Sequence, residues 1–335
     1  MKSSAKYAFT FLIMAAGYLS GWFKIQETEA AFTKLPNPTG LPTGHGHSSS
    51  FSPDMNYLAV AHMNEPFVTI YKRSGDMFTK LANPSVLPAG NGFGAAFSPD
   101  GAYLAVAHDV SPYVTIYKHD GDKFAKLANP DVLPISVGRK VRFVTTAGGT
   151  TYMAVAHKRY PYITIYKRNG DTFTKLADPE VLPTGYGYGA SFSPDGIYLV
   201  IAHDKAPFVT IYYRSGDTFT KLANPDILPT NVGCGPSFTP DGTYLAVGHD
   251  DYPFLTIYKV DPTHPTTIPS FPSASLSPSH LPAVAGRGRL GMGWLFFGAV
   301  LTHQATLDER RGREQGRGFT TPRILDRHRG ACCVL

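Results

Sequence analysis

The chain has few cysteines and none of the common catalytic motifs. Its 335 residues include three cysteines, Cys234, Cys332 and Cys333, so the repeats described below do not depend on disulfide bonds. No G-x-S-x-G elbow, phosphate-binding loop or H-E-x-x-H segment occurs. The repeats also lack a helical apolar period. A helical fold and the motif-defined hydrolases are therefore not indicated.

Instead, one sequence motif is repeated five times along the chain. It reads approximately F-S-P-D-G-x-Y-L-A-V-A-H, then P-F-V-T-I-Y-K, then G-D-x-F-T-K-L-A-N-P, and ends in a glycine-rich stretch. Its histidines are spaced by 46, 49, 46 and 46 residues; they are His62, His108, His157, His203 and His249. A period of this size is typical of repeat architectures in which each unit buries its faces against its neighbours.

The second unit illustrates the strands expected in each repeat. Apolar and β-branched runs at 95–98, 103–108, 113–117 and 123–127 predict four strands. The first two are separated by Pro99-Asp100-Gly101, and Asp120-Gly121 is a strong hairpin signal. Both faces of these strands are apolar, as in 67–71, so each sheet must be covered on both sides. A ring of four-stranded antiparallel blades provides that cover.

The strand count predicts how the ring closes. Four units carry four strands each, and the fifth, from about 233 to 260, carries three. An additional strand-like segment at 32–35 precedes the first unit. We expect it to pair with the strand at 254–259, which completes the fifth blade and hides two open edges.

The repeated motifs resemble those of a known superfamily. F-S-P-D-G followed by Y-L-A-V-A and T-I-Y resembles the WD-repeat and YVTN-type β-propeller superfamily over about 31–260. The strand count and the resemblance together predict an all-β, five-bladed β-propeller of four-stranded antiparallel blades, closed by an N-terminal outer strand. The Trp-Asp pair of the WD family is replaced by Ile-Tyr-Lys, which is closer to secreted bacterial propellers. Because propellers serve many functions, the resemblance names no reaction.

The two ends of the chain differ from the repeats. Residues 1–30 have two lysines before an apolar stretch and a small-x-small site at Thr28-Glu29-Ala30, as in a signal peptide or an uncleaved signal anchor. We therefore expect export, to the medium or the cell surface. Residues 261–335 are Pro/Ser-rich and then Gly/Arg-rich, a composition typical of disorder. Cys332-Cys-Val-Leu335 fits a prenylation pattern, which conflicts with export.

Charge gives little indication of partners. The formal net charge is +6. Residues 261–335 supply +4 of it, with nine arginines against five acidic residues. The propeller itself therefore shows no basic footprint for nucleic acid. A monomer is expected, in contact with a membrane only if residues 1–30 are retained.

The third unit departs from the motif at 136–149. It is three residues longer and places Arg139, Lys140 and Arg142 at or near the innermost strand. One interpretation is a specialised basic lip at the mouth of the ring. The other is that 136–149, like 261–335, is frame-shifted sequence.

The repeated histidines and aspartates could be read as metal-binding or catalytic residues, but a structural role explains them better. The five repeat histidines should lie too far apart around a ring to share a metal, and we expect them to bond a loop carbonyl or a nearby carboxylate. The Asp of S-P-D-G is expected to form the turn. The Asp of G-D-x-F is expected to be solvated on the outer rim. We expect no metal, no cofactor and no catalytic residue.

Specificity should lie where the repeats differ. The glycine-rich stretches carry rings and amides that suit stacking against a sugar or a peptide, and these candidate ligand-binding residues are His45, His47, Asn91, Phe93, Tyr186 and Tyr188. They could also merely plug the ring. The sequence therefore favours an exported, non-enzymatic recognition module that binds a protein or glycan at its central face. The alternative is a propeller enzyme: a lactonase, a lyase or a glycosidase-like hydrolase.

Overall fold

The computed structural model describes residues 33–261, of which 33–260 belong to one unit. The expectations for residues 1–30, for the tail beyond 261 and for Cys332 lie outside these residues. Within the described part the chain forms nineteen strands and no helix. No helix long and apolar enough to cross a membrane occurs among residues 33–261.

The strands form five antiparallel sheets, one for each repeat. The first contains β1 (Gly46–Phe51), β2 (Tyr57–His62), β3 (Val68–Ser74) and β4 (Met77–Lys80). The second contains β5 (Gly92–Phe97), β6 (Tyr103–His108), β7 (Val114–Asp120) and β8 (Lys123–Lys126). The third contains β9 (Gly138–Thr145), β10 (Thr151–His157), β11 (Ile163–Asn169) and β12 (Thr172–Lys175). The fourth contains β13 (Gly187–Phe192), β14 (Tyr198–His203), β15 (Val209–Ser215) and β16 (Thr218–Lys221). The fifth contains β17 (Gly233–Phe238), β18 (Tyr244–His249) and β19 (Leu255–Lys259).

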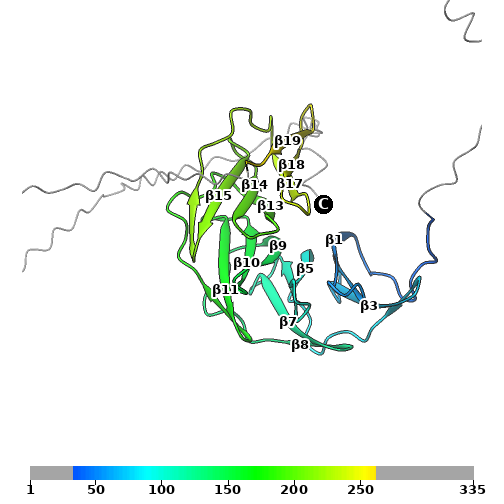
Figure 1. The fold of residues 1–335 in the computed structure, drawn as a ribbon. Coiled ribbons are helices and arrows are strands. Elements are labelled where there is room, and N and C mark those ends of the chain that lie inside the picture. Colours follow the sequence, from blue (N-terminus) through cyan, green and yellow to red (C-terminus); the bar gives the residue numbers. More distant parts are fainter. Residues whose placement is uncertain (1–32, 262–335) are drawn as a thin grey trace, which may run out of the picture. The chain divides into compact units, whose positions relative to one another are not determined.

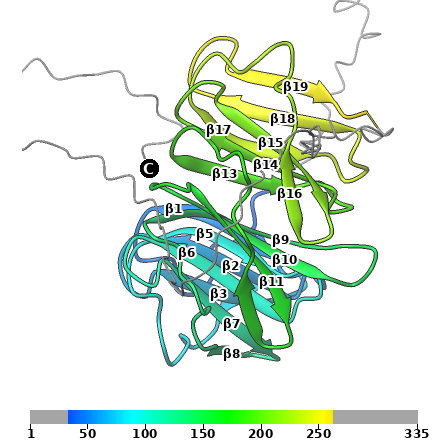
Figure 2. The same cartoon turned by 90° about the vertical axis from the view of Figure 1, so that its left-hand side faces the viewer.

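The sheets follow one another as the blades of a propeller. The first strand of each blade packs against the first strand of the next, in the order β1, β5, β9, β13, β17. These are the innermost strands, and the later strands of each blade fan outward from them (Figures 1 and 2). The expected all-β, five-bladed antiparallel propeller is confirmed.

The core consists of layers between blades. Ala59, Ile70, Leu104 and Val106 pack in one cluster between the first and second blades. A second cluster joins the opposite face of the second blade to the third. Each middle blade is thus covered on both faces, which explains why its strands are apolar throughout.

Closure by an N-terminal strand is wrong. Thr33, Lys34 and Leu35 belong to no strand, and β19 pairs only with β18, so the fifth sheet has three strands within the described residues. The N-terminal segment instead meets its own first blade, through a bridge between Thr39 and Thr79. The sequence pattern correctly identified a missing strand in the fifth blade, but a four-residue segment does not specify its partner.

The outer face of the fifth blade is uncovered in the described residues. Ile257 is 61% exposed, whereas Ile116, at the same position of the second blade, is 3% exposed. Phe254 and Leu255 are also exposed. The packing that joins β13 to β17 has no counterpart between β17 and β1 among the described strands.

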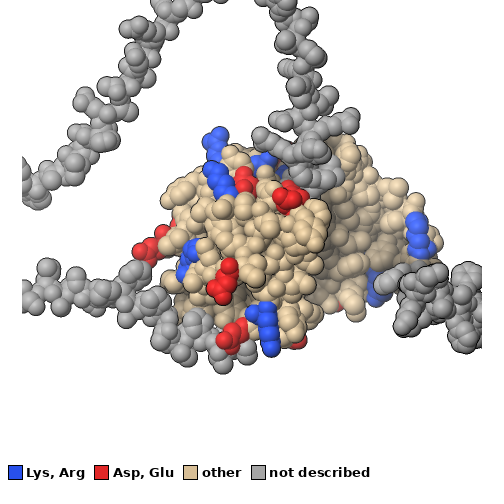
Figure 3. Space-filling view, turned by 90° about the horizontal axis from the view of Figure 1, so that it is seen from above, with Lys and Arg blue, Asp and Glu red and all other residues tan. Residues whose placement is uncertain are grey.

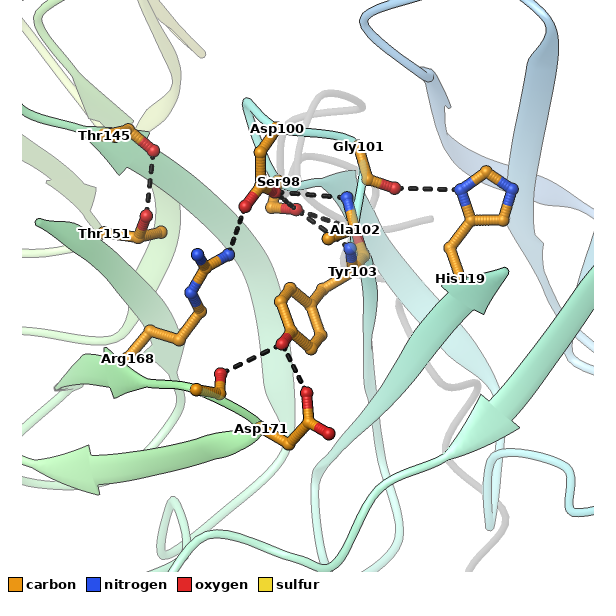
Figure 4. A network of polar contacts seen from close by, with 11 residues as sticks. Ser98, Asp100, Gly101, Ala102, Tyr103, His119, Thr145, Thr151, Arg168 and Asp171 are labelled. Carbon is orange, nitrogen blue, oxygen red and sulfur yellow. Dashed lines mark hydrogen bonds and ion pairs between the residues drawn. The ribbon is translucent and has the colours of Figure 1, made fainter. Parts of the chain in front are cut away.

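A polar network connects the second blade to the third at the S-P-D-G turn of the second blade (Figure 4). The Ser98 hydroxyl donates to Asp100 Oδ1 at 2.6 Å, and the Tyr103 backbone N–H donates to Ser98 Oγ. Arg168 of the third blade forms an ion pair with Asp100. The same Ser/Thr–Asp bond recurs in the first, fourth and fifth blades. Hydrogen bonding within the turn accounts for the repeated aspartate.

The aspartate of G-D-x-F is also structural rather than simply solvated. Tyr103 donates its hydroxyl to Asp171 at 2.6 Å, and Lys118 forms an ion pair with the same carboxylate at 2.7 Å. Burial and this carboxylate raise the pKa of Tyr103 to about 12. Equivalent contacts of Tyr57 with Asp122 and of Tyr152 with Asp217 join the first blade to the second and the third to the fourth.

Removing one such hydroxyl should destabilise the protein modestly. We expect Tyr103→Phe to lower the free energy of unfolding by about 1–2 kcal/mol, because the half-exposed Asp171 loses a short hydrogen bond. The matched control is Tyr113→Phe, whose hydroxyl makes no hydrogen bond within residues 33–261, and it should change stability by less than about 0.5 kcal/mol. Urea denaturation of both variants tests this, and equal effects would contradict it.

Candidate functional site

The innermost strands all begin with a β-bulge. In the first, second and fourth blades the register shifts between two residues that flank a single extra one, namely His47, Phe93 and Tyr188. In the third blade the pairing of β10 with β9 skips Arg139. A bulge leaves its extra residue out of the ladder and re-aims its side chain. The variable residue of each G-x-G or G-x-K segment is therefore turned away from the regular sheet faces.

In the second to fifth blades, the glycine before the bulge is required by the packing between blades. A Cβ at Gly138 would lie 2.4 Å from the Tyr113 carbonyl oxygen of the preceding blade. A Cβ at Gly92 would lie equally close to the Phe67 carbonyl oxygen. Glycine lets one backbone approach the next, and this approach brings the bulge residues of successive blades together.

Four bulge residues form a continuous stack. The His47 and Phe93 rings have centroids 4.9 Å apart. The Arg139 Cζ lies 4.5 Å from the Phe93 ring centroid and 5.4 Å from that of Tyr188. A guanidinium between two rings is a favourable cation–π arrangement. The stack comes from β1, β5, β9 and β13.

The structure brings together three of the six predicted binding residues. His47, Phe93 and Tyr188 lie inside strands, at bulges, rather than in loops outside them. His45, Asn91 and Tyr186 precede the strands. The His45 carbonyl accepts from the Met63 N–H, and the Tyr186 ring lies 6.0 Å from Tyr162. Arg139, noted in the sequence only as part of a basic segment, is the member that sequence reasoning did not place in the site.

Three further aspartates were also missed by the sequence reasoning. They occupy the position after the repeat histidine, which reads Met63, Asp109, Lys158, Asp204 and Asp250 along the five blades. All three are half-buried. This position varies from blade to blade, which is the signal that could have identified it.

Two of the aspartates are oriented by the segment that precedes the bulge. The Asn91 side-chain amide donates to Asp109 Oδ2 at 2.9 Å. The Tyr186 backbone N–H donates to Asp204 Oδ1 at 2.7 Å. Asp204 Oδ2 has no hydrogen-bond partner within residues 33–261, so it remains able to accept a proton from a ligand.

Burial and neighbouring charges shift several ionisation equilibria here. Burial raises the pKa of Asp250, opposed by His249. Burial, and then the nearby Asp204, raise the pKa of Tyr188, which also interacts with Arg139 and Asp250. Burial and then Arg139 lower the pKa of Lys158. Carboxylates and a cation therefore converge electrostatically on Tyr188.

The repeat histidines have another environment. The Nε2 of each is hydrogen-bonded to a threonine Oγ1 seven residues later, at 2.9–3.0 Å. The expected bond to a loop carbonyl is present at His62, whose Nδ1 donates to the Met63 carbonyl at 2.9 Å. Burial lowers the pKa of His108, His157 and His203 to about 4. Within residues 33–261 no group of three or more His, Cys, Asp or Glu is placed to hold a metal ion.

Cys234 occupies, in the fifth blade, the position that Tyr188 occupies in the fourth. Its Sγ lies 3.5 Å from Asp250 Oδ1. It is disulfide-bonded, so it is not counted as a nucleophile.

Comparisons with known proteins point to one enzyme family. The family profile described as "Lactonase, 7-bladed beta-propeller" matches residues 20–224. None of the curated proteins matches this sequence. The match corrects the function expected from the sequence, because this family is named for an enzyme activity, and it supports the alternative of a propeller enzyme over a non-enzymatic recognition module.

The chain is similar at low identity to solved structures, one of which shares its fold with a TM-score above 0.5. A functionally unknown protein from Desulfotomaculum acetoxidans is 12% identical over 66% of this chain and 67% of its own, with a TM-score of 0.54. The hydrazine synthase of Kuenenia stuttgartiensis is 21% identical over 68% and 59%, with a TM-score of 0.47. The periplasmic gluconolactonase of Pseudomonas aeruginosa is 20% identical over 65% and 69%, with a TM-score of 0.48. The chain thus spans 59–69% of the length of these structures.

Proposed function

Because the chain belongs to the lactonase family of seven-bladed β-propellers, we propose that it is a hydrolase that opens a lactone ring at the inner ends of its blades. The observation that carries this proposal is the asymmetric set of Asp204, Asp250 and Arg139, each of which interacts electrostatically with Tyr188. Repeated residues in a propeller are scaffold, whereas hydrolysis needs different groups on different sides of one bond.

Asp204 is the proposed general base. The backbone N–H on Oδ1 orients the carboxylate, and a base held by a third group is the usual arrangement for such a role. Oδ2 takes a proton from water as the water oxygen bonds to the lactone carbonyl carbon. The proton then passes to the ring oxygen as the ring C–O bond breaks, so lactone and water give one hydroxy acid.

Arg139 is the proposed stabiliser of the oxyanion. Its guanidinium is held between Phe93 and Tyr188, and a fixed cation stabilises negative charge as it develops on the carbonyl oxygen. The Phe93 and Tyr188 rings offer flat surfaces for a sugar-like ring. A lactone as the substrate is also part of this proposal. The chain spans only part of the length of the structures to which it is similar, so their substrates are not carried over to it as findings.

Export, the monomeric state and the finer superfamily resemblance remain predictions. Export through residues 1–30 and a monomeric state are compatible with this function. The finer resemblance to WD and YVTN repeats is compatible with the family. Figure 3 shows basic and acidic side chains interspersed on the face that it displays, without a large field of one sign.

Lactone opening by the full chain tests the function. We expect it to hydrolyse glucono-δ-lactone or δ-valerolactone, with Asp204→Asn lowering kcat/KM by about 10²–10⁴-fold, because the general base is lost. Asp226→Asn, at an exposed position, is the control and should keep full activity. No turnover above the uncatalysed rate, or full activity of Asp204→Asn, would reject the assignment.

A further inference from the structure

The third blade carries two long cations where the other blades have small residues. Lys140 pairs with Ala156, and the residues in the same register are Ser48, Gly94 and Gly189. Arg142 pairs with Ala154, and the residues in its register are Ser50, Ala96 and Ser191. Residues two apart on a strand share a face, so both cations project from the same side of β9.

Neither cation has a carboxylate partner. Both side chains are half-buried. The ion pairs of the described residues involve outer strands and turns, and none includes Lys140 or Arg142. Burial and then Arg142 lower the pKa of Lys140 to about 8, and burial alone lowers the pKa of Arg142, with no carboxylate contributing to either shift. A desolvated cation without a counter-charge is costly.

The hydrogen-bonding capacity of the pair is mostly unused. Lys140 Nζ donates to Ser48 Oγ at 3.4 Å, and Arg142 Nη1 donates to the Val141 carbonyl at 3.0 Å. A lysine ammonium has three donors and a guanidinium has five. The donors that remain face no acceptor within residues 33–261.

Lys140 reaches from the third blade to the first. Ser48 lies on β1, and β5 packs between β1 and β9. A Cβ at Gly94 of β5 would lie 3.1 Å from the Lys140 Cα, so β9 packs directly on this glycine. The ammonium is therefore held among the innermost strands of three blades rather than on an outer rim.

The geometry points to a binding site for a small oxyanion between Lys140, Arg142 and Ser48 at the innermost strands. The ligand is an inorganic sulfate or phosphate or a short carboxylate. A guanidinium fork matches two oxygens of such an ion, while the ammonium supplies a point charge and the serine hydroxyl a further donor. This site is independent of the lactone chemistry proposed above, because it uses neither Asp204 nor Arg139.

Thermal unfolding of the full chain tests the site. At constant ionic strength, raising sulfate, phosphate or acetate should increase the unfolding temperature saturably by about 2–4 °C, as expected for one ligand that binds only the folded state. Lys140→Met and Arg142→Met should abolish the saturable rise. Without added oxyanion their unfolding temperature should equal or exceed that of the wild type, because an uncompensated buried charge is removed.

The control is Lys126→Met on β8, whose ammonium is already bound to the Leu127 carbonyl and to Asn129 Oδ1. It should keep the full oxyanion response. Sulfate also stabilises proteins without binding, but that effect does not saturate and would be the same in all variants. An unsaturable response in the wild type, or an equal response in Lys140→Met and Lys126→Met, would overturn the proposal.

Discussion

Lowering the pH from 7 to 5 is expected to reduce the free energy of unfolding by on the order of 4–6 kcal/mol. The cause is three buried repeat histidines, His108, His157 and His203, whose pKa values burial lowers from 6.5 to about 4. In the unfolded chain these histidines bind protons below pH 6.5, whereas in the folded protein they stay neutral until about pH 4. The unfolded state therefore gains protons in this window and is stabilised as the pH falls.

The size of the effect follows from the shift. A histidine with these two pKa values contributes about 2 kcal/mol between pH 7 and pH 5. The contribution is fully present above pH 6.5 and is lost progressively below it. The turn aspartates with lowered pKa values, such as Asp100, act at more acidic pH and do not contribute in this window.

Urea denaturation at pH 7, 6 and 5 measures the dependence. His108→Gln supplies the matched control, because its amide can still bond Thr115 Oγ1 but does not titrate. That variant should lose about one third of the pH dependence, whatever its stability at pH 7. A free energy of unfolding that is flat from pH 7 to 5 would show that these histidines titrate normally in the folded protein.

Gly189→Ala is expected to lower the free energy of unfolding by about 1–3 kcal/mol or more. The same substitution at the matched position of the fifth blade, Gly235→Ala, should have almost no effect. A Cβ at Gly189 would lie 2.1 Å from the Cys234 carbonyl oxygen and 2.4 Å from Pro236 Cδ. Both contacts belong to the next blade, whose backbone cannot move away without separating β13 from β17. Gly189→Ala should therefore lower the urea midpoint strongly.

Gly235 is the matched position in the fifth blade. A Cβ there meets nothing within 4 Å, because no blade follows among the described residues. Gly235→Ala should leave the midpoint unchanged or raise it slightly, since alanine restricts the unfolded chain more than glycine does. If Gly235→Ala were as destabilising as Gly189→Ala, another segment or chain would have to cover the fifth blade in solution.

The sequence alone determined the blades. The strand predicted at 103–108 is β6 (Tyr103–His108), and those predicted at 113–117 and 123–127 match β7 and β8 closely. Each of these strands pairs with its neighbour in the chain, so local pattern and turn residues suffice to specify it. The strand predicted at 95–98 begins earlier, at Gly92, because the glycine-rich segment continues the ladder through a bulge.

Contacts between blades were decided only by the tertiary structure. Neither the uncovered fifth blade nor the stack of His47, Phe93, Arg139 and Tyr188 follows from the pattern within one repeat. Both depend on the angle and distance at which whole sheets pack, and that geometry comes from buried layers and close backbone contacts between residues of different repeats. The sequence therefore specified each blade, whereas packing between blades set the open end of the propeller and brought Asp204 and Arg139 within electrostatic range of Tyr188.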